Sequence, residues 1–225
     1  MKFKHIFFDL DRTLWDFEIN SHSTLEELFS TFNLKAKGVK KSDDFIRIYK
    51  EHNEKLWGLY RVEKISQIDL RRERFQRTLA DFGIHDFALA EAIGEQYISI
   101  CPKKSQLFPH SIVVLEYLSK KYKLHIITNG FHKVQHVKLK YANLTKYFNA
   151  IITSEKVGVM KPNPKIFAFA LETANAKSSE SVYIGDDLEV DILGCQNYGM
   201  DGIYFNPKRK KHAESITFEI NCLSQ

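Results

Sequence analysis

A chain of 225 residues, of which 44% are apolar, can bury roughly 70% of the surface that its unfolded form exposes, so a packed core needs neither disulfides nor a structural metal. The three cysteines lie far apart and form no C-x-x-C pair, which argues against a disulfide framework or a zinc site. No apolar run approaches the roughly 20 residues of a membrane span. We expect a soluble, unprocessed, cytoplasmic protein with no membrane partner.

The net charge of +5 comes from lysines and arginines that are interleaved with acidic residues along the chain, except for one basic cluster at 208–212. No aromatic residues interleave with this cluster. A solvated loop beside Pro207 is therefore the favoured interpretation, and a nucleic-acid polymer is not expected as a partner.

The chain begins with an apolar run at 3–8 that is typical of a buried strand and stops abruptly at Asp9. The stretch 16–106 then holds no convincing strand. It carries four apolar stripes at helical spacing: Leu25, Leu28, Phe29 and Phe32; Phe45, Ile48, Tyr49 and His52; Phe75, Leu79 and Phe82; and Leu89, Ile93 and Tyr97. This pattern predicts an all-helical domain over 16–106, inserted into a core formed by 1–15 and 107–225.

After the insert, strand-like runs alternate with helical patterns. The runs lie at 124–127, 150–153, 181–184 and 202–205, the last of which closes the series. The helical patterns are marked by Ile112, Leu115 and Leu118; by Val134, Val137 and Tyr141; and by Ile166, Phe169 and Ala170. Such alternation implies right-handed βαβ crossovers, so the predicted core is an α/β fold with a parallel sheet covered on both faces.

Polar residues follow the ends of several predicted strands, and the ends of parallel strands meet at one edge of a sheet. The predicted edge gathers Asp9, Asp11, Thr128, Asn129, Asp186, Asp187 and Asp191, with Lys161 joining from the segment after the third strand. Two carboxylates about 4 Å apart repel by roughly 4 kcal/mol at an effective dielectric near 20, so a cation must lie among them. All the donors are hard oxygens, which Mg²⁺ prefers to a greater degree than zinc or copper. A Mg²⁺ ion with the Lys161 ammonium would offset the charge and bind a phosphate.

Four motifs made of these residues resemble those of the haloacid dehalogenase superfamily. They are D-L-D-R-T-L from Asp9, T-N-G from Thr128, the pair Lys161-Pro162, and G-D-D-L-E-V-D from Gly185. They occur in the order that the family has, and they span nearly the whole chain. The resemblance implies a Rossmann-like core, and it implies that the helical insert is a cap that closes over the substrate.

The resemblance also implies a role for each acidic residue. Asp9 would attack phosphorus as the nucleophile, while Asp11 would protonate the leaving oxygen and then activate water. The Asp9 carboxylate, the Asp11 backbone carbonyl and Asp186 would hold Mg²⁺. Asp187 and Asp191 would orient the waters of the metal or the Lys161 ammonium.

The remaining motif residues are implied to bind the phosphate. Thr128, Asn129 and Gly130 would donate hydrogen bonds to its oxygens. Lys161 would pair with the phosphate and with Asp9.

Simpler interpretations exist for single residues. Asp191 alternatively caps the following helix or adds negative charge to its first turn, and Lys161 alternatively is a solvated loop lysine. Trp57 is expected to pack in the core of the insert, although with its neighbours it is also a possible base-stacking surface. Phe131 and His132, which directly follow the T-N-G motif, are candidates to face the substrate, and Cys195 is expected to be buried and inert.

Several activities remain open within the family. Asp11 argues against carbon–halogen cleavage, because the haloacid dehalogenases that the family resemblance brings in perform that reaction without a second aspartate or a metal. A phosphonate hydrolase would need a cap lysine that forms a Schiff base, for which Lys50 and Lys55 are candidates. A sugar-phosphate phosphatase or phosphomutase would share the same core residues. From another class, a phospho-receiver switch domain also combines Asp, Thr and Lys, but its phosphoacceptor follows a later strand.

The segment Thr13–Phe17 and the length of the insert are similar to those of pyrimidine-type 5′-nucleotidases. We therefore predict a Mg²⁺-dependent phosphatase of small phosphomonoesters that prefers nucleoside monophosphates, with sugar phosphates as the alternative. The predicted assembly is a monomer or a weak homodimer.

Overall fold

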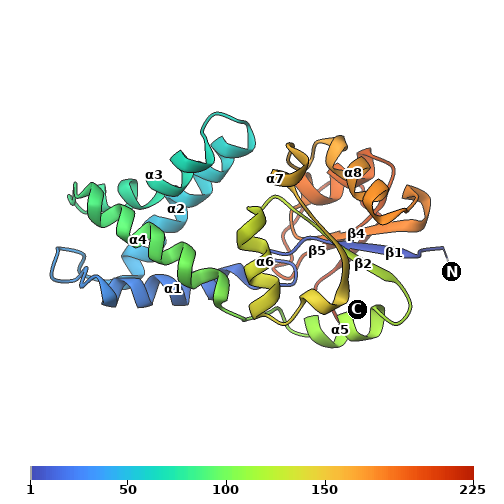
Figure 1. Ribbon diagram of the computed structural model, residues 1–225, viewed down its shortest axis with the longest axis horizontal. Helices are drawn as coiled ribbons and strands as arrows, with labels where there is room; N and C mark the ends of the chain where they lie inside the picture. The colour runs from blue at the N-terminus through green and yellow to red at the C-terminus, as the bar shows by residue number, and fades with distance from the viewer. Residues whose placement is uncertain (1) are drawn as a thin grey trace. The chain divides into compact units, whose positions relative to one another are not determined.

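The computed structural model describes residues 2–225, and these residues divide into two compact units, each drawn in Figure 1. One unit comprises the chain up to Phe17 together with Lys103–Gln225, and the other comprises Glu18–Pro102. The second unit lies within the insert predicted at 16–106.

The first unit is built on a parallel sheet. Within residues 2–225 this sheet has six strands in the order β3-β2-β1-β4-β5-β6, and all neighbouring strands are parallel. The strands are β1 (His5–Phe8), β2 (Lys123–Thr128), β3 (Phe148–Thr153), β4 (Ser181–Gly185), β5 (Asp201–Phe205) and β6 (Phe218–Ile220). Because β1 lies between β2 and β4, the strand order reverses there, and such switch points are where open α/β sheets bind ligands. The predicted α/β fold class with a parallel sheet is confirmed.

Helices cover both faces of the sheet, and Figure 1 shows α5 and α8 on opposite sides of it. The helices of this unit are α5 (Ser111–Leu118), α6 (His132–Tyr141), α7 (Ser154–Val157), α8 (Pro164–Ala174) and α9 (Gly194–Asn197), with short turns η2 (Thr145–Tyr147), η3 (Ser178–Glu180) and the π-helix η4 (Leu188–Leu193). Phe7, Ile127 and Tyr183 project from one face into a cluster with Ile166 and Phe167 of α8. Full burial of each such side chain contributes roughly 2 kcal/mol, so these contacts fix the strand ends against α8.

The second unit is helical throughout its regular structure, with α1 (Phe17–Thr31), α2 (Ser42–Arg61), α3 (Gln67–Ala80), α4 (Phe87–Ile100) and the turn η1 (Cys101–Lys103) at its boundary. Its core is aromatic. The Tyr49 ring lies 4.8 Å from that of Phe75 and 5.5 Å from that of Tyr97, and Arg74 lies over all three rings. Cation–π contacts of this kind explain how a guanidinium is tolerated at only 6% exposure.

Local signals set the ends of these helices. Ser66 and Asp69 form a reciprocal capping box at the start of α3, and the Asp86 side chain accepts a hydrogen bond from Leu89 N at the start of α4. Gly83, after α3, has a φ of +75°, which glycine adopts without the steric cost that a Cβ brings.

The sixth strand corrects the sequence analysis, which closed the series of strands at Phe205. β6 has three residues, and it lies at the edge of the sheet beside β5. Its first two residues, Phe218 and Glu219, are exposed. A strand this short and this exposed carries no alternation of apolar and polar residues over the four to eight positions from which a strand is predicted.

The buried face of α6 also differs from its predicted stripe. Gln135, Lys138 and Leu139 are buried, whereas Tyr141 is 51% exposed. In α1 the buried positions include three polar residues, Asn20, Ser21 and Thr24. Apolar periodicity missed these positions because polar side chains occupy them, among them Lys138 and Gln135, which donate to Asp11, and Ser21, which bonds to the Tyr97 hydroxyl.

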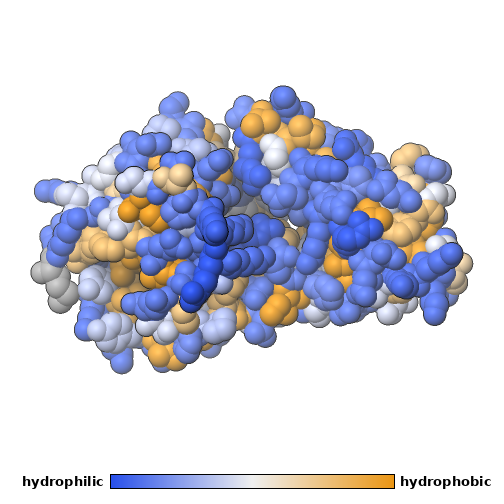
Figure 2. Space-filling view, turned by 180° about the vertical axis from the view of Figure 1, so that it is seen from behind, coloured by the Kyte–Doolittle hydropathy of each residue, from blue (hydrophilic) through white to orange (hydrophobic). Residues whose placement is uncertain are grey.

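The face of the molecule in Figure 2 is mostly hydrophilic, with scattered apolar side chains. Among the described residues, no helix has the length and apolar character that crossing a membrane requires.

Candidate active site

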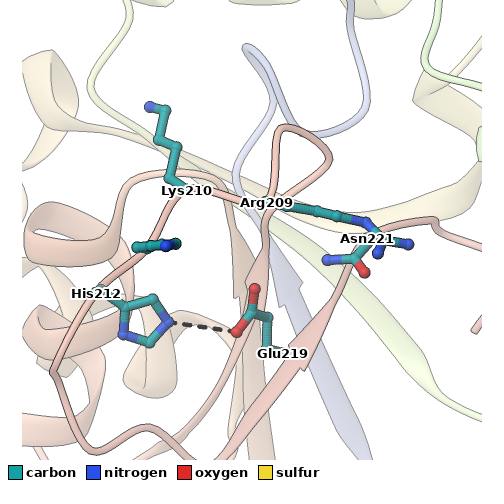
Figure 3. A pocket seen from close by; sticks show the side chains of 6 residues that line it. Arg209, Lys210, His212, Glu219 and Asn221 are labelled. Carbon is teal, nitrogen blue, oxygen red and sulfur yellow. Dashed lines mark hydrogen bonds and ion pairs between the residues drawn. The ribbon is translucent and has the colours of Figure 1, made fainter.

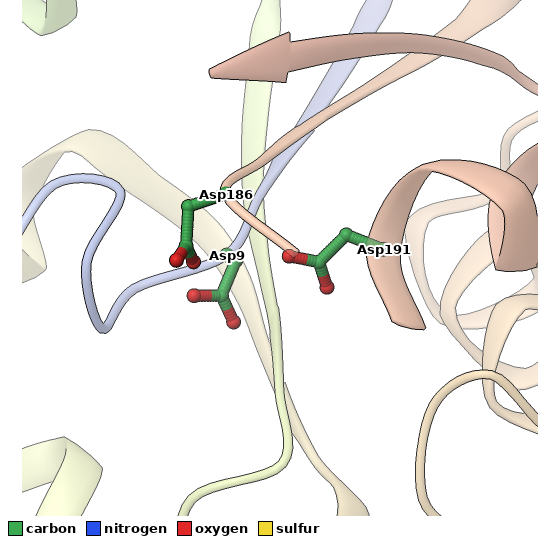
Figure 4. A group of neighbouring side chains, drawn as sticks. All are labelled: Asp9, Asp186 and Asp191. Atoms are coloured by element: carbon green, nitrogen blue, oxygen red, sulfur yellow. The ribbon is translucent and has the colours of Figure 1, made fainter. Parts of the chain in front are cut away.

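Three carboxylates converge at the C-terminal edge of the sheet, at the switch point (Figure 4). Asp9 follows directly after β1, Asp186 follows β4, and Asp191 lies in η4. One oxygen from each of the three lies within 4.8 Å of the others. The apolar strands β1 and β4 pair in register as far as Phe8 and Ile184, so the first polar residues after each strand emerge side by side.

The Lys161 ammonium lies among these carboxylates and is 3% exposed. Its Nζ donates to Asp9 Oδ1 and to Asp191 Oδ1, each at 2.7 Å. The same Nζ lies 2.8 Å from the Tyr183 hydroxyl and 3.0 Å from the Ile127 carbonyl oxygen. A buried ammonium needs partners of this number and charge. The alternative of a solvated loop lysine is wrong for Lys161.

The Asn129 side chain holds the backbone of Lys161 in place. Its Oδ1 accepts from Lys161 N at 2.8 Å, and its Nδ2 donates to Lys161 O at 3.0 Å. The peptide bond from Lys161 to Pro162 is cis. In this structure the amide predicted to donate to phosphate is thus engaged in positioning the lysine.

Thr128 and Gly130 complete this turn. Thr128 is 1% exposed, and its Oγ1 accepts from Gly130 N at 3.1 Å. A Cβ on Gly130 would lie 1.5 Å from Gln135 Nε2, so only glycine leaves space for the Gln135 amide.

Asp187 and Asp191, which were predicted to share one role, make different contacts. Asp187 is the residue that caps the start of η4, because its Oδ1 accepts from Glu189 N and Val190 N. Asp191 Oδ2 instead accepts from Asp187 N at 3.2 Å while its Oδ1 faces Lys161. The capping alternative is therefore wrong for Asp191. Gly185 allows this approach, since a Cβ there would lie 2.3 Å from Asp191 Oδ2.

Burial and mutual repulsion dominate the electrostatics of the edge. The pKa of Asp9 is raised to about 7, chiefly by burial; Lys161 lowers it, and the carboxylates of Asp191 and Asp11 contribute to the rise. Burial likewise raises the pKa of Asp186 well above its usual range, and Asp9 and Asp191 add to this. Burial lowers the pKa of Lys161, but the carboxylates of Asp191 and Asp9 outweigh it, so the net direction is upward. The Arg12 guanidinium lowers the pKa of Asp186, but Lys161 and Arg12 together bring two positive charges to three carboxylates, so negative charge remains uncompensated.

The chemistry of this donor set fits a hard divalent cation. All three side chains offer carboxylate oxygens, which are the ligands that Mg²⁺ favours. Both oxygens of Asp191 already accept hydrogen bonds from Lys161 Nζ and Asp187 N. Asp9 and Asp186, whose carboxylates lie side by side in Figure 4, are therefore better placed to act as direct ligands.

The Asp11 carboxylate is not one of the three clustered carboxylates, and it hydrogen-bonds to α6. Lys138 Nζ donates to Asp11 Oδ1 at 2.5 Å, and Gln135 Nε2 donates to Asp11 Oδ2 at 2.8 Å. The roles of both residues were not predicted from the sequence, and neither was that of Tyr183, which has the pattern of an ordinary core residue of β4. The available signal was the i, i+3 spacing of Gln135 and Lys138 directly after the T-N-G motif.

A family model of haloacid dehalogenase-like hydrolases matches residues 3–199, which is most of the chain. The chain belongs to this family of hydrolases. The predicted resemblance is confirmed, and the match covers all four motifs.

Known relatives of this hydrolase include two nucleotidases. Pyrimidine 5′-nucleotidase YjjG of Escherichia coli is 34% identical over 228 residues, covering 100% of this chain and 96% of that protein. Pyrimidine 5′-nucleotidase PynA of Streptococcus pneumoniae is 30% identical, covering 96% of this chain and 88% of that protein. A crystal structure of the hydrolase YfnB of Bacillus subtilis, bound to magnesium, has a TM-score of 0.89 at 26% identity and covers 100% of this chain and 96% of that one.

Other residues singled out in the sequence of this hydrolase lie in ordinary packing environments. Phe131 is 8% exposed and Cys195 is fully buried, as expected for Cys195, and burial raises the pKa of the Cys195 thiol to about 12. The His132 ring bonds to Thr153 Oγ1. Trp57, expected in the core of the insert, is only half-buried and stacks edge-on with Tyr60 at 5.6 Å.

The basic cluster of the hydrolase lines a pocket of about 610 Å³ beside β6 (Figure 3). Its lining residues are Arg209, Lys210, Lys211, His212, Glu219 and Asn221. Glu219 lies 3.3 Å from His212 Nε2, and it also accepts from Asn206 Nδ2 at 2.7 Å. Glu219 thus brings one carboxylate to the basic cluster, and none of the predicted site residues lines this pocket.

Proposed function

We propose that this phosphatase hydrolyses nucleoside monophosphates with the Asp9 carboxylate as its nucleophile. The observation that carries the proposal is the Asp9 carboxylate at the end of β1, held by the buried Lys161 ammonium and adjacent to Asp186. A phosphoryl group bound at this edge meets a nucleophile, a cation and the groups of the T-N-G turn. Phosphoryl transfer depends mostly on such positioning and charge.

The reaction proceeds in two displacements. In the first, an Asp9 oxygen forms a bond to phosphorus while the bond to the ester oxygen breaks, and Asp11 gives a proton to that leaving oxygen. In the second, water attacks phosphorus while Asp11 takes its proton, and the bond to Asp9 breaks to release phosphate. The covalent intermediate divides one high barrier into two lower ones.

Lys161 keeps Asp9 oriented through both steps. Its Nζ contacts Asp9 Oδ1 while three other acceptors fix the ammonium. The same ammonium would neutralise part of the phosphoryl charge. Thr128 and Gly130 lie at the start of the neighbouring turn, where their backbone and hydroxyl groups would bind phosphoryl oxygens.

Mg²⁺ is the proposed cofactor, held by the Asp9 and Asp186 carboxylates and by the backbone carbonyl of Asp11. When bound, it supplies positive charge that favours the ionised Asp9 and offsets the charge of the phosphoryl group. The excess of carboxylates over ammonium groups and the raised pKa values of Asp9 and Asp186 support this assignment. Asp191 would hold Lys161, and Asp187 would stabilise η4 beneath the site.

The substrate class rests on the relatives. YjjG and PynA, which this chain matches over nearly its full length, are pyrimidine 5′-nucleotidases. The helical insert predicted at 16–106 is the proposed cap that selects the substrate. A cytoplasmic location and a monomeric or weakly dimeric state remain predictions.

A screen of phosphorylated metabolites with Mg²⁺ tests this proposal. We expect phosphate release from pyrimidine nucleoside monophosphates at a higher kcat/KM than from sugar phosphates, and no release by Asp9→Asn. Rapid cleavage of sugar phosphates with indifference to nucleotides would discard the nucleotidase assignment. A single stoichiometric phosphorylation without turnover would instead indicate a phospho-receiver switch, and transfer between sugar hydroxyls would indicate a phosphomutase.

A further inference from the structure

The Asp11 carboxylate has both of its oxygens held by one helix. Lys138 Nζ contacts Oδ1 at 2.5 Å, and Gln135 Nε2 contacts Oδ2 at 2.8 Å. Lys138 and Gln135 are 5% and 1% exposed, respectively. The Asp11 side chain is 24% exposed, so the two donors approach it from the protein side.

The donors are themselves fixed in place. Both belong to α6, which begins two residues after Gly130. The Lys138 Nζ lies 4.3 Å from the centre of the Trp15 ring, and this ring is fully buried and donates from Nε1 to Lys104 O. Gln135 occupies the space that a Cβ on Gly130 would fill. Neither donor therefore has much freedom to follow a moving carboxylate.

The backbone around Asp11 is equally constrained. Arg12, the next residue, has a φ of +65°, and its N–H donates to Trp15 O at 2.8 Å. Non-glycine residues rarely adopt such a φ, so the turn that carries Asp11 has a specific shape. The last torsion of an aspartate is broad, and two donors on separate oxygens are what restrict it.

We propose that Lys138 and Gln135 are positioning residues that hold the Asp11 carboxyl in register for its acid–base steps. The inference rests on the proposed function, in which Asp11 protonates the leaving oxygen and then activates water. A proton is transferred efficiently only over a hydrogen-bond distance with a defined direction. A rotating carboxyl would spend much of its time outside that geometry.

The test is the dependence of kcat/KM on the leaving group for a series of substituted phenyl phosphates. p-Nitrophenolate leaves readily without a proton, whereas phenolate depends far more on the general acid. We expect Lys138→Met to lower kcat/KM for phenyl phosphate by about 10²-fold, within the range of general acid catalysis. The same variant should lower kcat/KM for p-nitrophenyl phosphate by less than about tenfold, so the dependence on the leaving group becomes steeper.

Gln135→Leu provides a second variant that removes the other donor and should steepen the dependence in the same direction. The matched control is Lys140→Met, because Lys140 is an exposed lysine of the same helix; it should leave the whole series unchanged. The inhibition constant of inorganic phosphate should stay within about twofold in every variant, because Asp9 and Lys161 are untouched, and a merely structural defect would move it.

An equal loss for all esters in both variants, or a loss in Lys140→Met as large as that in Lys138→Met, would overturn the inference. A wild-type enzyme that cleaves these esters, with Asp9→Asn inactive and the Lys138 and Gln135 variants unaffected, would overturn the inference alone. A wild-type enzyme that releases phosphate from neither these esters nor nucleoside monophosphates, or an active Asp9→Asn variant, would remove the proposed function and the inference together.

Discussion

Two aspartate–lysine pairs, whose acids are two residues apart in the sequence, lie in opposite electrostatic surroundings. Asp9 and Lys161 are buried in the carboxylate cluster at the end of β1, where Asp186 and Asp191 add negative charge. Asp11 and Lys138 meet beside the aromatic rings of Trp15 and Phe17, with a neutral amide as the second donor. The first environment favours a cation and a nucleophile, and the second favours a carboxyl with a fixed direction. Asp9 and Asp11, although close in the sequence, thus have different chemical roles because their surroundings differ.

Removing the nucleophile is expected to have the largest effect. Asp9→Asn should lower kcat by at least about 10⁴-fold, because no other group is placed to bond phosphorus. The fold should persist, since the substitution removes one of three repelling carboxylates. Steady-state phosphate release measures kcat, and urea unfolding measures the free energy of unfolding. Substantial activity in this variant would contradict the assignment of Asp9 as the nucleophile and of Asp11 as the acid and base.

Removing the buried ammonium should destabilise the fold more than any other single change in either pair. Lys161→Met leaves Asp9 and Asp191 buried without their common partner, and breaking a buried pair in this way costs about 3–5 kcal/mol. Lys165→Met, at an exposed position of α8, is the control and should stay within about 0.5 kcal/mol of the wild type. Urea unfolding of the metal-free protein gives both values, and equal stabilities would contradict the burial argument.

Two buried histidines at the opposite end of β1 make the stability of the fold depend on pH. His5 Nδ1 lies 3.1 Å from His125 Nε2, and burial, with His5 and Lys123 nearby, lowers the pKa of His125 to about 4. Between pH 6.5 and 4 the unfolded chain therefore binds a proton that the folded chain does not, so stability is present above this window and falls as the pH falls through it. About 2.5 pH units correspond to about 3 kcal/mol.

Urea unfolding of wild type and His125→Leu across this window measures the contribution of His125. The fall in stability should be shallower in the variant by about 3 kcal/mol. His85→Gln, at an exposed position, should retain the slope of the wild type. Parallel slopes in all three proteins would mean that the imidazole pair is not a source of acid sensitivity.

Metal binding should have the smallest of these effects on stability and should show whether the carboxylate cluster beside the first pair holds the metal. At about ten times its dissociation constant, Mg²⁺ should stabilise the wild type by about 1.4 kcal/mol, seen as a rise in melting temperature. Asp186→Asn should abolish this rise, while Asp187→Asn should retain it, because Asp187 caps η4. An undiminished rise in the melting temperature of Asp186→Asn on adding Mg²⁺ would mean that the metal binds outside the carboxylate cluster.

The residues at the strand ends were predictable because a parallel sheet brings together the polar residues that follow its apolar strands. Asp9, Thr128 and Asp186 each follow an apolar run, and one rule of topology gathers them at one edge. Lys161 required its motif, because nothing in the local pattern distinguishes a buried loop lysine from a solvated one. Its burial follows from distant partners in β2 and η4.

The second pair was not predictable from patterns of hydrophobicity. Gln135 and Lys138 are polar residues on the buried face of α6, so periodicity assigned that face to Val134, Val137 and Tyr141 instead. Their burial is explained by Asp11, which is more than a hundred residues away in the chain. The edge strand β6 was not predicted for a different reason, since three residues, of which two are exposed, carry too little signal.

The most direct test of the account is chemical trapping of the covalent intermediate during turnover. Sodium borohydride reduces an aspartyl phosphate to homoserine, and peptide mass spectrometry locates the reduced residue. We predict homoserine at position 9, appearing only when substrate is present. Reduction at position 11, or unmodified aspartate at both positions under conditions in which substrate is being consumed, would contradict the assignment of Asp9 as the nucleophile.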